Sequence, residues 1–299
     1  MEIKIPFKTP SINHLHGHNK FGAFYLKPEA KKLKGALIEF DVSSVGATGN
    51  IMMAAVLAKG TTVIGNAAKE PEISCLAEFL IKMGAKIDGV GTNRLKIEGV
   101  DELHPVNEKM IPDRIEAGTF IAAVAITGGN IVIKKSNPDH LTFVLSKFQE
   151  AGVTIRLNDS DIIVEAPEKL EPINVTTAPY PGFPTDMQAQ WTALMSVTPG
   201  ISVVKDTIYL DRFNHVSELR RLGADIRIES NSAIVRGVKE LKGATVMSTD
   251  LRASASLIIA GLAARGRTDV LRVYHIDRGY EKIEEKLKKL GAEIRREKV

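Results

Sequence analysis

The stretch Leu222-Gly223-Ala224-Asp225-Ile226 joins a helix pattern to a strand pattern, and three related stretches occur elsewhere in this 299-residue chain. They are centred on Gly84, Gly152 and Gly291, so consecutive copies lie about 70 residues apart. Each glycine stands where a helix would end, because glycine adopts the left-handed cap conformation without a Cβ clash. The chain is therefore predicted to consist of four repeated units.

Hydrophobic periodicity gives the order of elements within a unit. In the first unit we expect helices at 46–59 and 72–83, and strands at 36–41, 61–64, 86–88 and 94–98. The same β-α-β-α-β-β order is predicted at about 105–167, 172–238 and 241–299, with helices near 114–126, 138–150, 186–197, 213–222, 252–264 and 279–290. A unit this small cannot bury its sheet face alone, so the units are expected to pack together in an α/β fold.

Composition excludes several classes of protein. Hydrophobic residues make up 44% of the chain and charged residues 25%, a mixture that rules out wholesale disorder. No apolar run approaches the roughly 20 residues of a membrane helix, and the first residues lack the apolar core of a signal peptide. The single cysteine, Cys75, excludes an intramolecular disulfide and a cysteine-based zinc cluster. We therefore expect a cytoplasmic protein that does not contact a membrane.

The positive charge lies at the start of the chain. The net charge is +4, but residues 1–34 hold seven lysines against two acidic residues, and the rest of the chain is nearly neutral. Such a basic segment can bind nucleic acid, so a nucleic-acid-binding protein is one alternative. In the same segment, His14, His16 and His18 could lie on one strand face and bind a metal. Clusters of this kind are more often adventitious, and no metal site is predicted.

Two turns at helix starts carry candidate functional groups, because ligands of α/β units favour such positions. The turn Ser43-Ser44-Val45-Gly46 combines free backbone N–H groups, hydroxyls and a small residue, which suits a phosphate or diphosphate. A plain serine N-cap is the alternative. The second turn is Phe183-Pro184-Thr185-Asp186-Met187-Gln188, where Asp186 is either an N-cap or a general base that the helix dipole holds ionised.

Two further turns place an aspartate beside an arginine: Asp250 with Arg252, and Asp277 with Arg278. Arginine forks bind planar carboxylates and phosphates, whereas surface salt bridges are the alternative. Arginines at helix starts in a nearly neutral stretch indicate a small anionic substrate. Residues 35–299 contain no Walker loop, Rossmann glycine fingerprint, serine–histidine–aspartate order or metal-ligand spacing.

The sequence around these turns closely resembles the UDP-N-acetylglucosamine enolpyruvyl transferase (1-carboxyvinyltransferase) family over about residues 33–299. The resemblance is carried, in the family's order, by residues 44–48, 66–73, 180–190, 249–254 and 274–280. It implies an inside-out α/β barrel of repeated β-α-β-α-β-β units in each of two domains. It also implies transfer of the enolpyruvyl group of phosphoenolpyruvate to the 3-hydroxyl of UDP-N-acetylglucosamine, a step in the synthesis of peptidoglycan precursors.

The resemblance also assigns roles to residues. It implies that the sugar nucleotide is bound by Ser44, Val45, Gly46, Glu70, Asp186, Ile208 and Arg212. Asp186 would take the proton of the sugar's 3-hydroxyl, and Asp250 would assist in proton handling. Arg252 and Arg278 would bind the phosphoenolpyruvate anions and the charge of the tetrahedral intermediate. No metal or organic cofactor is implied.

The chain departs from the family in its number of units. The family has six units and this chain four; the missing stretch carries a Lys-Asn pair, two arginines and a loop with a reactive cysteine. We therefore expect 1–34 to be an unrelated lysine-rich segment, 35–104 one unit of the first domain, and 105–299 a complete three-unit second domain. The truncated chain is expected to be weakly active or inactive alone, unless another chain supplies the missing units. A non-catalytic module that binds a sugar nucleotide is the alternative.

Overall fold

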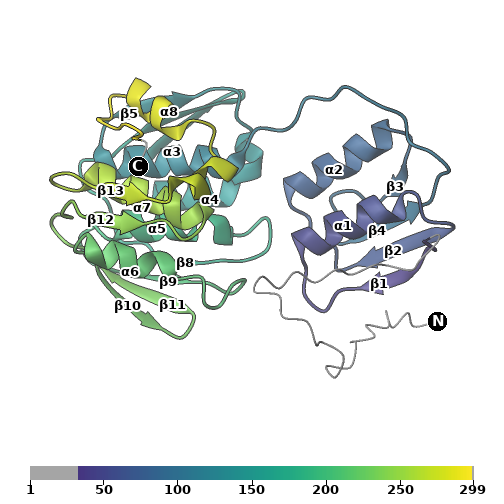
Figure 1. Ribbon diagram of the computed structural model, residues 1–299, viewed down its shortest axis with the longest axis horizontal. Helices are drawn as coiled ribbons and strands as arrows, with labels where there is room; N and C mark the ends of the chain where they lie inside the picture. The colour runs from purple at the N-terminus through teal and green to yellow at the C-terminus, as the bar shows by residue number, and fades with distance from the viewer. Residues whose placement is uncertain (1–32, 298–299) are drawn as a thin grey trace, which may run out of the picture. The chain divides into compact units, whose positions relative to one another are not determined.

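The computed structural model describes residues 33–297, and the chain divides into two compact units between Met110 and Ile111 (Figure 1). The boundary expected at 104/105 lies close to this division. His14, His16 and His18 lie outside the described residues. No helix in the described part of the chain is long and apolar enough to cross a lipid bilayer.

The first unit is a four-stranded sheet with two helices. Its elements are β1 (Leu37–Glu39), α1 (Val45–Ala55), β2 (Thr61–Gly65), α2 (Pro71–Lys82), β3 (Lys86–Asp88) and β4 (Arg94–Glu98). In the sheet order β1-β2-β4-β3, β1 and β2 are parallel and the other neighbours antiparallel. The predicted order of elements is confirmed, but α1 ends at Ala55 instead of residue 59. Lys59 pairs with Lys34 in a bridge, so the chain has already left the helix there.

The second unit contains three groups of such elements. They are α3 (Arg114–Thr127), β5 (Asn130–Ile133), α4 (Thr142–Glu150), β6 (Thr154–Asn158), β7 (Asp161–Glu165), β8 (Val175–Thr176), α5 (Gln188–Met195), β9 (Ile201–Lys205), α6 (Asn214–Arg221), β10 (Asp225–Glu229), β11 (Ser232–Arg236), β12 (Thr245–Met247), α7 (Leu251–Ala263), β13 (Asp269–Leu271) and α8 (Ile283–Lys289). Short 3-10 turns precede three of the helices: η2 (Pro138–Leu141), η3 (Thr185–Met187) and η4 (Val273–Arg278).

The sheets of the second unit follow the same strand order, but two of the three have fewer strands. The order β8-β9-β11-β10 repeats the first unit's sheet, with one parallel pair followed by two antiparallel pairs. The other two sheets are shorter: β5-β7-β6, which is antiparallel, and β12-β13, which is parallel. The full four-stranded sheet of the repeat is thus present in two sheets, β1-β2-β4-β3 and β8-β9-β11-β10, and the other two sheets lack one or two of its strands.

Three expected features of the second unit are wrong. No strand precedes α3; the connecting stretch 101–113 contains two prolines, which lack the N–H that a ladder needs. No strand follows Gly291, because residues 292–297 have no neighbouring strand in the described chain. The helix expected at 279–290 is confined to α8, because Lys282 takes a left-handed conformation (φ +46°) just before it.

All four repeat glycines end helices as predicted. Their φ values are positive: +107° at Gly84, +95° at Gly152, +92° at Gly223 and +101° at Gly291. In each copy the glycine N–H donates to the carbonyl three residues before it, and the next N–H donates to the carbonyl five residues before its own residue. This pair of bonds is the Schellman motif, which reverses the chain and directs it into the following strand position.

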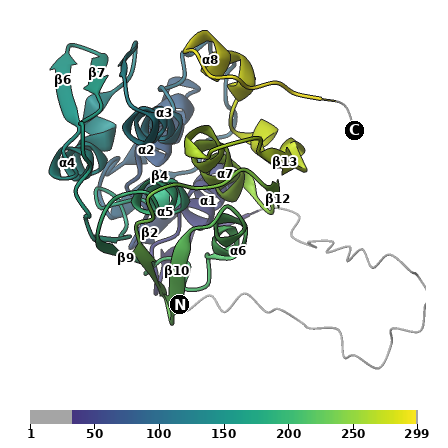
Figure 2. The same cartoon turned by 90° about the vertical axis from the view of Figure 1, so that its left-hand side faces the viewer.

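Helices α3, α5 and α7 form the core of the second unit. They pack against one another, and Figure 2 shows them at the middle of the unit with the paired strands around them. Every residue of α5 is buried, and α7 buries eight consecutive residues, Ala253–Ala260. Helices that are apolar all round are expected at the centre of a core. Their packing brings the turns at the starts of α5 and α7 together.

Candidate active site

Asp186 lies between two arginines. Its Oδ1 accepts a hydrogen bond of 2.8 Å from Arg212 Nη1, and its Oδ2 accepts one of 2.7 Å from Arg252 Nη2. Asp186 belongs to η3, and neither η3 nor α5 has a side-chain N-cap, so the capping alternative is excluded for this residue. The side chain is 37% exposed, which leaves the carboxylate accessible to a small molecule.

The two guanidinium groups decide the charge state of Asp186. Burial on its own would raise the pKa of this carboxyl, but the charges and hydrogen bonds of Arg252 and Arg212 outweigh it and hold the pKa below its usual value. Asp186 is therefore a carboxylate at neutral pH, able to accept a proton from a bound hydroxyl.

Arg252 is held by a buried polar network. Its side chain is 12% exposed, and its Nη1 donates to Tyr280 Oη at 3.3 Å. The Tyr280 hydroxyl also lies 2.8 Å from Thr119 Oγ1, which accepts a bond from Gln190 Nε2 at 3.1 Å. Burial raises the pKa of Tyr280, so its hydroxyl stays protonated at neutral pH. The network joins α3, α5 and α7 and fixes the direction of the Arg252 guanidinium.

The other predicted residues of the second unit lie in different surroundings. Asp250 is the N-cap of α7: its Oδ1 accepts from the N–H groups of Arg252 and Ala253 at 2.9 Å each. Its role in proton handling stays a prediction. Arg278 is exposed at the end of η4 and forms no ion pair with the described residues, while Asp277 pairs with Arg296 at 2.7 Å. Neither aspartate forms the side-chain pair with its neighbouring arginine that the sequence suggested.

Four predicted residues lie in the first unit. Ser44 accepts a bond from Ala47 N–H at 3.3 Å, as an N-cap of α1 does. Val45 and Gly46 follow it and are exposed; a Cβ added to Gly46 would meet nothing within 4 Å, so open space lies in front of this turn. Glu70 stands at the start of α2, and its Oε2 is buried without a hydrogen-bond partner among residues 33–297. The first turn thus caps its helix and still presents a free surface.

The sequence did not single out three residues around Asp186: Thr185, Asp206 and Tyr280. Tyr280 lies within the stretch 274–280 that carries the family resemblance, but the resemblance implied no role for it. Asp206 directly follows β9, and the carboxyl end of a strand is where ligands of α/β units gather. That position was the available signal for it. Ile208, which the resemblance placed in the sugar-nucleotide site, lies on the turn after Asp206 and is 39% exposed.

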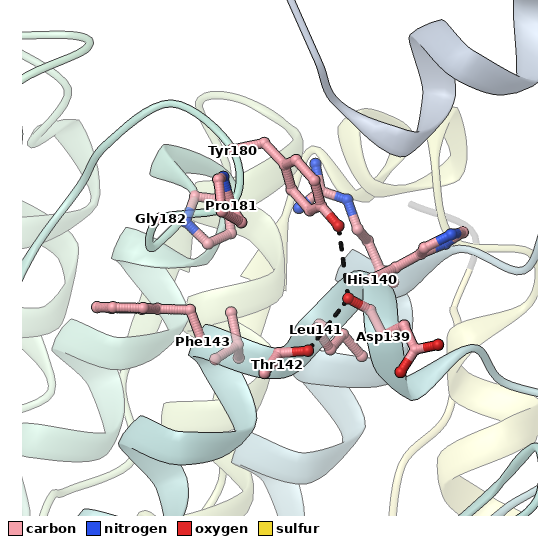
Figure 3. A pocket seen from close by; sticks show the side chains of 11 residues that line it. Asp139, His140, Leu141, Thr142, Phe143, Tyr180, Pro181 and Gly182 are labelled. Carbon is pink, nitrogen blue, oxygen red and sulfur yellow. Dashed lines mark hydrogen bonds between the residues drawn. The ribbon is translucent and has the colours of Figure 1, made fainter. Parts of the chain in front are cut away.

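A small cavity lies beside η2 and the Tyr180–Pro184 segment (Figure 3). It measures about 40 Å³ and is lined by Arg114, Asp139, Phe143 and Tyr180 among others. Tyr180 Oη donates to the Asp139 carbonyl at 3.4 Å. A cavity of this size holds a few water molecules at most and is far smaller than a sugar-nucleotide pocket. This cavity alone therefore does not hold a sugar nucleotide.

His215 is a buried histidine near the Asp186 cluster. It lies on α6, is 2% exposed, and its Nε2 has no hydrogen-bond partner in the part of the chain that the structure describes. Burial lowers the pKa of His215 to about 4; Arg212 adds to the decrease, and Asp250 and Asp206 oppose it. His215 is therefore neutral at pH 7.

We expect the His215→Gln protein to be less sensitive to acid. In the wild-type protein the unfolded chain takes up a proton near pH 6.5 and the folded chain only near pH 4, so stability is lost as the pH falls through this window. Between pH 7 and pH 5 the loss is about 2 kcal/mol, and the variant should not show it. Urea unfolding at both pH values measures the difference, with the exposed His104→Gln as control. Equal losses in wild type and His215→Gln would contradict it.

Comparisons with known proteins agree with the geometry. The model of the family described as EPSP synthase (3-phosphoshikimate 1-carboxyvinyltransferase) matches residues 14–287. A relative named UDP-N-acetylglucosamine 1-carboxyvinyltransferase, from Chloroherpeton thalassium, is 59% identical over 292 residues, which cover 95% of this chain and 68% of the relative. The chain belongs to the enolpyruvyl transferase family. A transferase of the same name from Myxococcus xanthus is 55% identical over 97% of this chain and 70% of its own length.

Solved structures show the same fold. The enolpyruvyl transferase NikO from Streptomyces tendae matches 89% of this chain and 66% of its own chain with a TM-score of 0.80 and 27% identity. EPSP synthase from Acinetobacter baumannii shares the fold with a TM-score of 0.68 and 20% identity. The chain therefore spans about two thirds of the length of these enolpyruvyl transferases.

The family match also moves one expected boundary. It begins at residue 14, whereas the recognised motifs placed the start of the resemblance at about residue 33. The matched residues thus include 14–34, which are part of the lysine-rich segment that was expected to be unrelated to the family. The short motifs missed this part because they are concentrated at the helix-start turns.

Proposed function

We propose that this chain acts in the transfer of the enolpyruvyl group of phosphoenolpyruvate to the 3-hydroxyl of UDP-N-acetylglucosamine, in peptidoglycan precursor synthesis. The observation that carries the proposal is the accessible Asp186 carboxylate held between Arg212 and Arg252. The identity of 59% to a protein named for this reaction supports the choice of a sugar nucleotide over a shikimate phosphate.

The chemistry uses each group of the cluster. Asp186 takes the proton from the sugar's 3-hydroxyl as the hydroxyl oxygen bonds to C2 of phosphoenolpyruvate, and C3 accepts a proton from a general acid to complete the addition. In the elimination, C3 gives up a proton to a general base, the C2–O bond to phosphate breaks, and the double bond between C2 and C3 forms again. Arg252, and with it the exposed Arg278, provides positive charge for the carboxylate and phosphate of phosphoenolpyruvate and for the charge developed in the intermediate. The resemblance names no metal or organic cofactor for these steps.

We infer that the first unit is one member of a three-unit domain. Its helix α1 resembles the central helices α3, α5 and α7 in being apolar along most of its length, yet Met53 in the helix and Leu57 just after it are 47% and 49% exposed. The relatives are longer than this chain by about a third of their length. A complete site would need two further units, supplied by more of the protein or by another chain, so the activity of the present chain alone should be weak or absent.

Calorimetric titration with UDP-N-acetylglucosamine tests the proposal. We expect heat of binding at millimolar ligand, and binding weaker by about 10- to 150-fold in Arg212→Gln, because a charge-assisted hydrogen bond is worth about 1.5–3 kcal/mol. The exposed Arg227→Gln is the matched control. Absence of heat would contradict sugar-nucleotide recognition.

A second measurement separates an enzyme from a binding module. Phosphate release from the two substrates, lost in Asp186→Asn, would support catalysis. Binding without release would leave the non-catalytic sugar-nucleotide module as the function of this chain. The nucleic-acid alternative depends on residues 1–34 and stays a prediction; DNA binding that depends on salt and is lost on deletion of that segment would support it.

A further inference from the structure

Asp206 is a fully buried aspartate at the end of β9. Its Oδ1 accepts three hydrogen bonds: from Thr177 Oγ1 at 2.8 Å and from the N–H groups of Ile208 and Tyr209 at 2.9 Å each. Its own backbone pairs with Asn231 through two bonds. The carboxylate therefore fixes the start of the turn that leads to Arg212.

The second oxygen of Asp206 reaches a different turn. Asp206 Oδ2 accepts a bond of 2.6 Å from Thr185 Oγ1, in η3, next to Asp186. Thr185 Oγ1 in turn accepts a bond of 3.1 Å from Arg212 Nη1, the same nitrogen that donates to Asp186 Oδ1 at 2.8 Å. One buried side chain thus joins the turn that carries Asp186 to the turn that carries Arg212.

The direction of the Thr185 hydroxyl follows from its partners. A guanidinium has only donors, and a carboxylate oxygen accepts, so the hydroxyl proton points to Asp206 and a lone pair faces Arg212. Without the acceptor at Asp206, the hydroxyl would be free to turn, and its lone pair would no longer be held toward Arg212.

We propose that Asp206 is a positioning residue, which acts through Thr185 to aim Arg212 at the carboxylate of Asp186. The role rests on the proposed function of Asp186 as the base. The competing interpretation is that Asp206 only caps its own turn. In that case its loss would lower stability and leave the electrostatics of Asp186 unchanged.

Thr185→Val tests the connection with the least disturbance, because it removes the hydroxyl and leaves the bonds from Thr177, Ile208 and Tyr209 to Asp206 in place. Thr185→Ser is the matched control, since it keeps the hydroxyl. Asp206→Asn is a second variant, in which an amide donor replaces the acceptor facing Thr185. The readout is the titration midpoint of the Asp186 carboxyl carbon, followed by NMR in protein labelled with ¹³C-aspartate and assigned with Asp186→Asn.

Loss of a well-aimed positive charge should raise the Asp186 midpoint by about one pH unit in Thr185→Val, and Thr185→Ser should keep the wild-type midpoint. In Asp206→Asn the rise should be smaller, because a nearby negative charge is removed as well. An unchanged midpoint in folded Thr185→Val, judged by near-ultraviolet circular dichroism, would overturn the proposal, whatever happens to the urea midpoint. The readout needs no substrate. A shifted midpoint without sugar-nucleotide binding would therefore reject the proposed function and leave the positioning role standing.

Discussion

The Trp191→Ala protein is expected to lose about 4 kcal/mol of unfolding free energy, because truncation of a fully buried aromatic leaves a cavity as well as lost burial. Trp191 lies at the centre of α5 with no exposed surface. Its ring meets Phe148 and Phe183 edge-on, with centroids 5.1 and 5.6 Å away. Its indole N–H donates to the Ile173 carbonyl at 3.2 Å, so the truncation also removes the partner of that carbonyl.

Trp191→Phe separates the ring from the hydrogen bond. This variant keeps most of the packing and should lose about 1–2 kcal/mol. Because the chain has a single tryptophan, the urea unfolding curves must be followed by circular dichroism and not by fluorescence. A loss below about 2 kcal/mol in Trp191→Ala would mean that the site collapses around the smaller side chain and that the core is less tightly packed than the contacts indicate.

Features set by local chemistry were predictable from the sequence. A glycine after an amphipathic run has one low-energy way to end a helix, so Gly84 and Gly223 could be assigned before the structure was known. The repeated phrase Leu-Lys-Gly-Ala also behaves alike in its two copies: Leu33 accepts a bond from Lys59 N–H, and Leu241 accepts one from Arg265 N–H. The two identical sequence segments make the same backbone hydrogen bond because each lies beside an equivalent turn of its own repeat.

Features set by distant partners were not predictable. The strand expected after Gly291 has the same local pattern as β10, which follows Gly223, but β10 pairs with β11 and residues 292–297 have no such neighbour. A segment forms a strand only when a neighbouring strand accepts and donates its backbone hydrogen bonds, and the sequence of the segment alone does not show whether that neighbour exists.

The candidate site shows the same division. Asp186 and Asp250 look alike in sequence, since each stands at a helix start. A cap was the alternative to a functional role for Asp186, and a surface salt bridge was the alternative for Asp250. The structure separates them. Asp250 accepts hydrogen bonds from N–H groups of its own helix, whereas Asp186 accepts hydrogen bonds from two arginine side chains of other turns. The choice between the two roles is therefore made by tertiary contacts, which periodicity does not reveal.

Gly237→Ala is expected to cost more than about 3 kcal/mol, at the upper end of what overpacking causes. Gly237 directly follows β11, and its N–H donates to Gly200 O at 3.0 Å. A Cβ at this position would lie 1.6 Å from the Thr198 carbonyl oxygen, which is backbone and cannot turn away as a side chain would. Gly99 has the same clash with Ala58 O in the first unit, so close approach of two backbones is a property of the repeat.

Another repeat provides the control for Gly237→Ala, because the position equivalent to Gly237 in that repeat is Ala166. Ala166 N–H donates to Gly129 O at 2.9 Å, as Gly237 N–H does to Gly200 O. The chain there passes through Gly128 with φ +85°, a conformation that Pro199, the residue in the equivalent place before Gly200, cannot adopt. We infer that this positive-φ step lets the backbone there take a path that leaves room for the Cβ of Ala166. Ala166→Gly should therefore cost only about 1 kcal/mol in urea unfolding, and a cost for Gly237→Ala no larger than this would contradict the backbone clash.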